Sequence, residues 1–240
     1  MSNIHFIGGE KGGVGKSVMA RVLAQYFIDR EIPIVGFDSD RSHASFSRFY
    51  SDFASPVIVD QFESLDAIME VFEESEDSTV IVDLAAQAHR PLSSWILESD
   101  LIGAVKDIDI GIKFWHVMDD GKESIQLLKT LCDTYGAEFQ YIIVLNEGRG
   151  ADFSAFEDSE EKERALRLGA AIMRLPKLQP STMQKIDRLN SSFWAAVNNG
   201  DRDNKVLGML ERRRAKAWLH KAFEAIDGVL TPAPKSNFES

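Results

Sequence analysis

A glycine- and lysine-rich segment near the N-terminus carries the strongest chemical signal in the sequence. It reads Lys11-Gly-Gly-Val-Gly-Lys-Ser17 and follows a short apolar run, Ile4–Ile7. The glycines Gly12, Gly13 and Gly15 let the backbone wrap closely around an anion, with its N–H groups pointing at the anion's oxygens. The segment therefore predicts a cradle for phosphate groups.

The residues around these glycines extend the prediction to a nucleotide and a metal ion. A helix predicted to begin near Lys16 points its unpaired N–H groups and positive dipole end at the same anion. Lys16 can reach the terminal phosphates, the Ser17 hydroxyl can bind Mg²⁺, and Val14 belongs to the same cradle. The usual pattern G-x-x-x-x-G-K-[ST] is not met, because Glu10 stands at its first glycine. The alternative is a glycine-rich turn with incidental lysines.

Acidic residues end two other apolar runs. Asp38 and Asp40 follow Ile34–Phe37, and Asp83 follows Val80–Val82. Parallel sheets bind ligands beyond the carboxyl ends of their strands, so these carboxylates are expected to face the phosphates and Mg²⁺. Asp83 would hold a metal-bound water. For Asp38 and Asp40 the alternative is that either one caps the helix that follows.

Strand-like and helix-like stretches alternate along the chain. The runs predicted as strands are Ile4–Ile7, Ile34–Phe37, Val57–Val59, Val80–Val82, Leu101–Val105, Tyr141–Leu145 and Ala170–Leu175. Near-continuous apolar strands separated by helices predict an α/β fold with a mostly parallel central sheet and helices on both faces. The phosphate cradle follows the first strand, where such sheets bind ligands.

Composition limits the domain organisation. The chain has 240 residues and a net charge of −11, and it shows no internal linker. We expect one domain over residues 1–230 and a flexible tail over 231–240. Cys132 is the only cysteine, which excludes a disulfide framework and a multi-cysteine zinc site. No signal-peptide pattern and no apolar run of about 20 residues is present, so we predict a cytoplasmic protein.

The segment Lys11–Ser17 resembles the deviant Walker A motif of the ParA/MinD family of P-loop ATPases, in which a second lysine stands at Lys11. The resemblance covers roughly residues 1–180. It implies a P-loop NTPase fold and an ATP-bound homodimer in which Lys11 touches the partner's nucleotide. It also implies that Asp40 positions the attacking water and that Asp38 supports the metal shell.

The same resemblance places the base of the nucleotide. It assigns Asn146, which ends the run Tyr141–Leu145, to the adenine edge, and Pro176 to a loop against the base. The sequence lacks the Asn-Lys-x-Asp signature of guanine selectivity, which favours ATP over GTP. Arg41 and Leu84 stand where the family often has proline, so the subfamily stays open.

The function that the resemblance implies is a Mg²⁺-dependent ATPase, slow and stimulated by a partner protein. Such an enzyme couples ATP binding and hydrolysis to the partition or positioning of DNA, for example a plasmid, or of another cargo. A metabolic synthetase of the dethiobiotin synthetase type is the alternative on the same scaffold, and it would not need Lys11. A nucleotide-binding switch with little turnover is a third possibility.

A cationic stretch near the C-terminus is a candidate surface for the cargo. Arg212, Arg213, Arg214 and Lys216 lie in the predicted helix Lys205–Ile226, where they can contact DNA phosphates without sequence preference. The alternative is a solvated cationic face on an acidic protein. The last ten residues contain two prolines, so the chain is not expected to attach to membranes through a C-terminal amphipathic helix.

Overall fold

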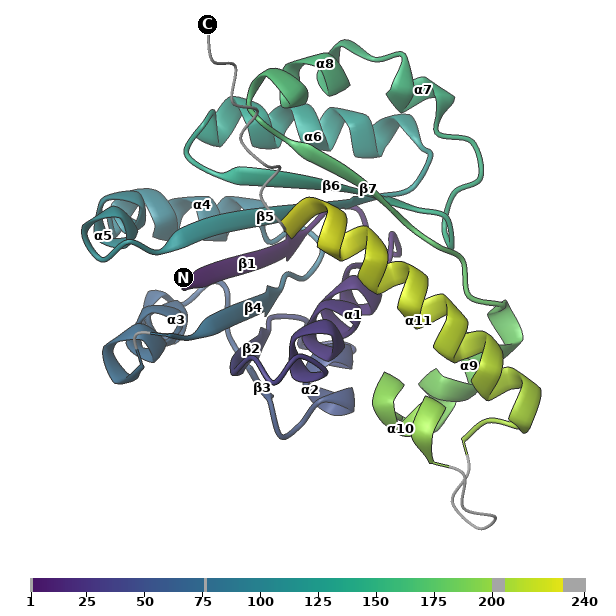
Figure 1. The fold of residues 1–240 in the computed structure, drawn as a ribbon. Helices are drawn as coiled ribbons and strands as arrows, with labels where there is room; N and C mark the ends of the chain where they lie inside the picture. Colours follow the sequence, from purple (N-terminus) through teal and green to yellow (C-terminus); the bar gives the residue numbers. More distant parts are fainter. Residues whose placement is uncertain (1, 76, 200–205, 231–240) are drawn as a thin grey trace, which may run out of the picture.

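The computed structural model describes residues 2–75, 77–199 and 206–230, and these residues fold around one parallel β-sheet. Its strand order is β3-β2-β4-β1-β5-β6-β7, and every pair of neighbours runs parallel (Figure 1). The strands are β1 (Asn3–Gly8), β2 (Ile34–Asp38), β3 (Ala54–Pro56), β4 (Thr79–Asp83), β5 (Gly111–Met118), β6 (Gln140–Asn146) and β7 (Ala171–Leu175). The predicted α/β fold is confirmed, and the predicted tail over 231–240 lies outside the described residues.

Helices cover both faces of the sheet, so its central strands are buried on both sides. One face carries α1 (Lys16–Ile28), α2 (Ser45–Phe49), α9 (Pro180–Arg188), α10 (Phe193–Asn198) and α11 (Met209–Leu230). The other carries α3 (Phe62–Glu74), α4 (His89–Glu98), α5 (Leu101–Asp107), α6 (Lys122–Tyr135), α7 (Ser154–Glu157) and α8 (Glu160–Arg167). None of the helices within the described ranges combines the length and apolar character that crossing a bilayer requires.

Two predicted strands are wrong in type or position. Residues Leu101–Val105 form most of helix α5, because a short apolar run carries no period that separates a buried helix from a strand. The strand in that part of the sheet is β5, Gly111–Met118, in which Trp115 and His116 are 0% and 2% exposed. Residues Val57–Val59 follow β3 instead of forming it.

The strand register gathers the predicted acids at one edge of the sheet. Asp38 pairs with Asp83 across β2 and β4, and Asp83 pairs with Ile7 across β4 and β1. β1 ends one residue later, at Gly8, and the glycine-rich loop follows it. Asn146 ends β6 at the same edge. The elements therefore bring the predicted site residues together, although they come from distant parts of the chain.

Candidate functional site

The loop between β1 and α1 lines a cleft of about 600 Å³ at the carboxyl edge of the sheet. Of the sequence-predicted residues, the cleft contains Gly12, Gly13, Gly15, Lys16, Ser17 and Asp40. The segment Leu84–Ala86, which follows Asp83, forms part of its wall. A loop at a helix N-terminus with a lysine, a hydroxyl and a carboxylate beside it is suited to an anion with several oxygens.

Gly15 is the loop residue at which both the backbone conformation and the surrounding atoms leave no room for a side chain. It immediately precedes α1 with a φ of 101°, a conformation that side chains rarely tolerate. A Cβ there would also lie 2.2 Å from Nδ2 of Asn146. That amide donates a hydrogen bond of 2.7 Å to the carbonyl of Val14, and its Oδ1 accepts one from the backbone N–H of Gly148. Asn146 therefore supports the loop from β6.

Lys16 lies over the loop and is only 8% exposed. Its Nζ donates a hydrogen bond of 3.1 Å to the carbonyl oxygen of Lys11. Burial lowers the pKa of Lys16, while the negative charges of Asp83, Asp40 and Glu10 oppose that change. A phosphate in the cleft would give this partly desolvated cation a counterion.

Asp83 is buried directly beneath the cleft. Both of its carboxylate oxygens lack a hydrogen bond of normal geometry within the described residues. Burial raises the pKa of Asp83 to about 8; the nearby Ser17 hydroxyl opposes the change, and the charge of Asp38 adds to it. A buried carboxylate without partners, beside a serine of the loop, fits the surroundings of a hydrated Mg²⁺ ion.

Asp38 and Asp40 both engage backbone groups of the segment that follows β2. Oδ1 of Asp38 accepts from the N–H of Asp40, and its Oδ2 accepts from the N–H and hydroxyl of Ser47 in α2. Oδ1 of Asp40 accepts from the N–H groups of Ser42 and His43. Asp40 nevertheless lines the cleft, whereas Asp38 lies behind it. Asp38 therefore contacts the first turn of α2 (Ser45–Phe49), as the capping alternative expects, whereas the contacts of Asp40 lie in the turn that precedes this helix.

A second cavity of about 230 Å³ adjoins the cleft. It contains both residues assigned to the base, Asn146 and Pro176. Trp218 of α11 closes one side, and its Nε1 donates a hydrogen bond of 2.6 Å to the carbonyl of Pro176. The indole therefore fixes the loop that follows β7. The two cavities share lining residues, so together they offer one site with an end at the phosphate loop and an end beside Pro176.

Lys11 does not line the cleft. Its Nζ lies 2.7 Å from Oδ2 of Asp119, just after β5, and 3.7 Å from Glu123 in α6. The hydrogen bond to Asp119 is the main cause of a raised pKa at Lys11. The lysine that marks the motif is therefore held by acids of its own chain.

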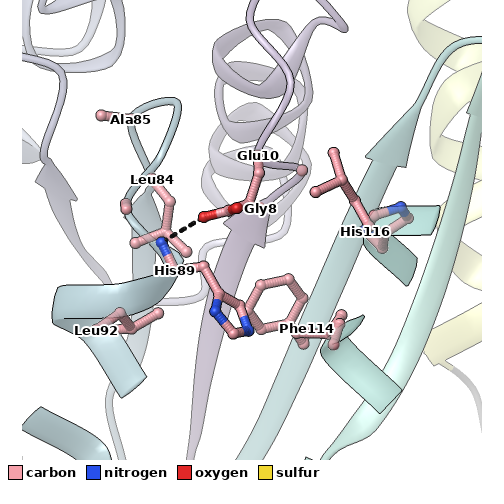
Figure 2. Close-up of a pocket in the computed structure, with 12 residues that line it drawn as sticks. Gly8, Glu10, Leu84, Ala85, His89, Leu92, Phe114 and His116 are labelled. Atoms are coloured by element: carbon pink, nitrogen blue, oxygen red, sulfur yellow. Dashed lines mark hydrogen bonds between the residues drawn. The ribbon is translucent and has the colours of Figure 1, made fainter. Parts of the chain in front are cut away.

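Glu10, which breaks the usual loop pattern, has a partner on the other face of the sheet. Its Oε1 accepts a hydrogen bond of 2.8 Å from the backbone N–H of His89, the first residue of α4 (Figure 2). A carboxylate is favoured at a helix N-terminus because it meets unpaired N–H groups and the positive end of the dipole. The small cavity beside it, about 20 Å³ in volume, has no room for a nucleotide. Glu10 thus ties the loop to the segment that follows Asp83.

The predicted cationic stretch forms the first part of α11. Arg213, Arg214 and Lys216 are exposed, while Arg212 is half-buried and donates to the carbonyl of Asn199. Among the described residues, none of these four side chains forms an ion pair with a carboxylate. They therefore present a cationic surface on α11, in which the charge of Arg214 also acts on the neighbouring carboxylate of Glu211.

Sequence reasoning missed several residues of the two cavities. Buried Arg21 pairs with the half-exposed Asp187 at the cleft, Arg149 lines both cavities, and Trp218 closes the second one. A charged Arg21 in the middle of an otherwise apolar helix face was the available signal. The others lie in unremarkable local sequence, and only the fold brings them to the site.

Fold and site together define a parallel α/β nucleotide-binding domain of the phosphate-loop type. Residues 5–223 match the model of the CobQ/CobB/MinD/ParA nucleotide binding domain, and the chain belongs to that family. The resemblance inferred from the Lys11–Ser17 motif is therefore confirmed at the level of the family.

Relatives match along nearly the whole chain. Protein MobD of Acidithiobacillus ferrooxidans is 22% identical over 233 residues, covering 95% of this chain and 98% of the relative. A Protein TraL of Escherichia coli is 23% identical over 240 residues, with the same coverage. Among solved structures, the MinD cell division protein of Aquifex aeolicus has a TM-score of 0.55 at 12% identity, covering 98% of this chain and 100% of its own. Apo McdA of Cyanthece has a TM-score of 0.54 at 13% identity, covering 95% and 99%.

Proposed function

We propose that this protein is a dimerising, ParA-like ATPase that couples ATP binding and hydrolysis to the partition or positioning of a cargo. One observation carries the proposal. A phosphate cradle with Lys16, Ser17 and nearby carboxylates opens into a second cavity that holds Asn146 and Pro176. An adenine nucleotide needs both ends of such a site at once, and an isolated phosphate needs only one.

The loop is assigned to the triphosphate. Backbone N–H groups of Gly12–Ser17 and the N-terminus of α1 would bind its oxygens, and Lys16 would move from the carbonyl of Lys11 to the terminal phosphates. A bound Mg²⁺ would neutralise charge that develops on the transferred phosphoryl group. Ser17 would bind the ion directly and Asp83 through water, while Asp38 would support that shell.

No cluster of three or more His, Cys, Asp or Glu side chains suited to a metal occurs among the described residues. The ion would therefore depend on phosphate oxygens and water as much as on protein ligands, which is usual for Mg²⁺.

Asp40 is assigned to hydrolysis. Its carboxylate lines the cleft beside the loop, and its side chain is 28% exposed, so water can reach it. The backbone N–H groups of Ser42 and His43 hold Oδ1, which leaves the second oxygen near the exposed His43 ring. A carboxylate fixed in this way can orient a water molecule towards the terminal phosphate.

Lys11 is assigned to the partner's nucleotide in an ATP-bound homodimer. Its contacts with Asp119 and Glu123 are those of the single chain and would have to break. Solved structures with this fold include a MinC:MinD cell division protein complex of Aquifex aeolicus, with a TM-score of 0.54. A stimulating partner protein is proposed here by analogy with that complex.

Trapping the dimer tests this proposal. Asp40→Ala should leave ATP binding intact and stop turnover, so the variant should elute as a dimer with ATP and Mg²⁺. Lys11→Ala should bind ATP but remain monomeric. Exposed Lys122 provides a matched control, and Lys122→Ala should behave as the wild type. Monomers for both the wild type and Asp40→Ala at saturating ATP would refute the dimer.

DNA is the proposed cargo contact, through Arg212, Arg213, Arg214 and Lys216. Doubling this cationic surface in a dimer would favour salt-sensitive binding to phosphates without sequence preference. The triple change of the three arginines to alanine should abolish ATP-dependent retention of DNA on a filter, while ATP turnover persists. If the ATP-bound wild type retains no DNA at low salt, the cargo is a protein instead.

A further inference from the structure

The cleft and the adjoining cavity share three lining residues, Val18, Arg149 and Asp187. These residues therefore mark the junction between the phosphate end and the base end of the site. A nucleotide with its phosphates on the loop and its base beside Pro176 has to carry its sugar across this junction. The chemistry of the junction decides which sugar the site accepts.

Asp187 presents a hydrogen-bond acceptor at the junction. It lies near the end of α9, and its Oδ1 accepts a hydrogen bond of 2.8 Å from Nη1 of Arg21. Oδ2 has no hydrogen-bond partner among the described residues, and the side chain is 46% exposed. A carboxylate accepts hydrogen bonds and cannot donate them, so its free oxygen is complementary to a hydroxyl group.

Arg21 holds this carboxylate in place. Its side chain is 3% exposed, and the guanidinium lies 3.7 Å from the ring centre of Phe49 and 4.7 Å from that of Phe193. Nε and Nη2 lack hydrogen-bond partners within the described residues, so among these residues the hydrogen bond of this guanidinium is the one that Nη1 donates to Asp187. The planar cation fits between two rings and prevents the carboxylate from rotating away.

The cations at the junction also explain how an acid can lie beside a triphosphate. An unpaired carboxylate close to phosphates would be repelled, most strongly where water is partly excluded. Arg21 offsets the charge of Asp187, and the stem of Arg149 passes Gly15, where its Cγ lies 3.9 Å from the position of an added Cβ. Two cations thus accompany one anion at the junction.

We propose that Asp187 is a specificity residue that accepts a hydrogen bond from a ribose hydroxyl, and that Arg21 is the positioning residue that orients it. The site then selects ribonucleoside triphosphates over their deoxy counterparts. This inference rests on the proposed binding of ATP and adds the recognition of the sugar.

The wild-type protein provides the first test. Calorimetric titrations with Mg²⁺ and ATP, 2′-deoxyATP or 3′-deoxyATP should show that removal of one hydroxyl weakens binding about tenfold or more, the usual effect of losing a hydrogen bond to a charged group. Equal affinity for all three nucleotides would overturn the inference and leave the proposed function standing. Failure to bind any of them would overturn both.

Variants separate recognition from stability. The reference ligand is whichever of the two deoxy nucleotides binds the wild type more weakly. Asp187→Ala should lower the affinity for ATP to the wild-type affinity for this deoxy nucleotide. The affinity of the variant for the deoxy nucleotide itself should differ from that of the wild type by less than about twofold. Arg21→Lys should reduce the ratio of the affinities for ATP and for this deoxy nucleotide. An ammonium group has no flat faces to pack between the two rings, so it cannot fix the carboxylate of Asp187 as the guanidinium does. Asp133 in α6 is a half-exposed, arginine-paired carboxylate, so Asp133→Ala is the matched control.

If Asp187→Ala unfolds, Asp187→Asn keeps an oxygen for Arg21 and replaces the free acceptor with a donor. The ratio of affinities for ATP and the deoxy nucleotide should then fall as well. A ratio that remains at the wild-type value in every folded Asp187 variant is incompatible with sugar recognition by this residue.

Discussion

Lys11 and Asp119 form an ion pair 2.7 Å long between the loop that follows β1 and the residue that follows β5. Partial burial acts to raise the pKa of Asp119, but hydrogen bonds from Lys11, Ser124 and Gly121 outweigh it and hold that pKa below its ordinary value. The lysine of the motif is thus engaged within its own chain. A dimer in which Lys11 crosses to the partner has to break this contact first.

Weakening the contact should therefore favour the dimer. Asp119→Asn removes the charge and keeps an oxygen for Ser124 and Gly121, so it should lower the ATP concentration at half-dimerisation by about two- to fivefold, the effect expected of a partly exposed ion pair. Analytical ultracentrifugation across an ATP series measures this midpoint. Glu123→Gln, at the more distant acid, should shift it less. An unchanged midpoint for Asp119→Asn would show that the pair does not oppose dimerisation.

Two glycines of the loop should respond differently to a methyl group. Gly15→Ala combines a positive φ with a contact of 2.2 Å to Asn146, so it should destabilise the free protein and abolish ATP binding. Gly12 has no atom within 4 Å of an added Cβ, so Gly12→Ala should keep the stability of the free protein and weaken only nucleotide binding. Urea unfolding with and without ATP compares the two. Equal loss of stability in both variants would contradict this description of the loop.

Glu10 should contribute to stability through the start of α4. Glu10→Ala removes the acceptor for the N–H of His89, a change that typically costs about 0.5–2 kcal/mol at a helix N-terminus. Glu10→Gln retains an acceptor oxygen and should lose less. Chemical denaturation of the three proteins at pH 7 provides the comparison. If Glu10→Ala is as stable as the wild type, the loop is not tied to α4 through this side chain.

The buried His116 should make the protein sensitive to acid. Burial lowers the pKa of His116 to about 4, even though its hydrogen bond to the carbonyl of Ser124 opposes the change. The unfolded chain, with a histidine pKa near 6.5, therefore binds more protons than the folded chain between these values, and stability falls as the pH drops from about 6.5 towards 4.

The expected loss over that window is about 2–3 kcal/mol for His116 alone. His116→Gln cannot titrate, so its free energy of unfolding should fall less steeply than that of the wild type between pH 6.5 and 4.5. Urea midpoints at five pH values measure both slopes. Parallel slopes for the two proteins would mean that folding does not lower the pKa of His116.

Local sequence revealed those parts of the site in which chemistry fixes the spacing of neighbouring residues. The loop Gly12–Ser17 and the acid at the end of β4 belong to this class, since a strand, a turn and a helix start must follow each other there. The parallel sheet was equally visible, because buried strands are apolar throughout. Two predicted strands are wrong: Leu101–Val105, where length and pattern fit either structure, forms a helix, and Val57–Val59 follows β3.

The remaining parts of the site depend on contacts between distant segments. Nothing in the sequence near Lys11 indicates that Asp119 holds it, and nothing near Asp187 indicates a pair with Arg21. Asn146 shows the same limit: the sequence predicts a contact with the base for its amide but gives no sign of its hydrogen bond to the carbonyl of Val14 in the loop. Such contacts follow from the order of strands in the sheet, which spacing alone does not supply.

Binding of ATP by the wild type and by Lys16→Ala tests the central claim most directly. Calorimetric titration with Mg²⁺ should give saturable binding of ATP by the wild type and by the surface control Lys122→Ala. Lys16→Ala should bind about 10- to 100-fold more weakly, because a charge-assisted contact to the phosphates is lost. Equal affinity in the wild type and Lys16→Ala, or no binding by either, would contradict the assignment of the loop to a nucleotide.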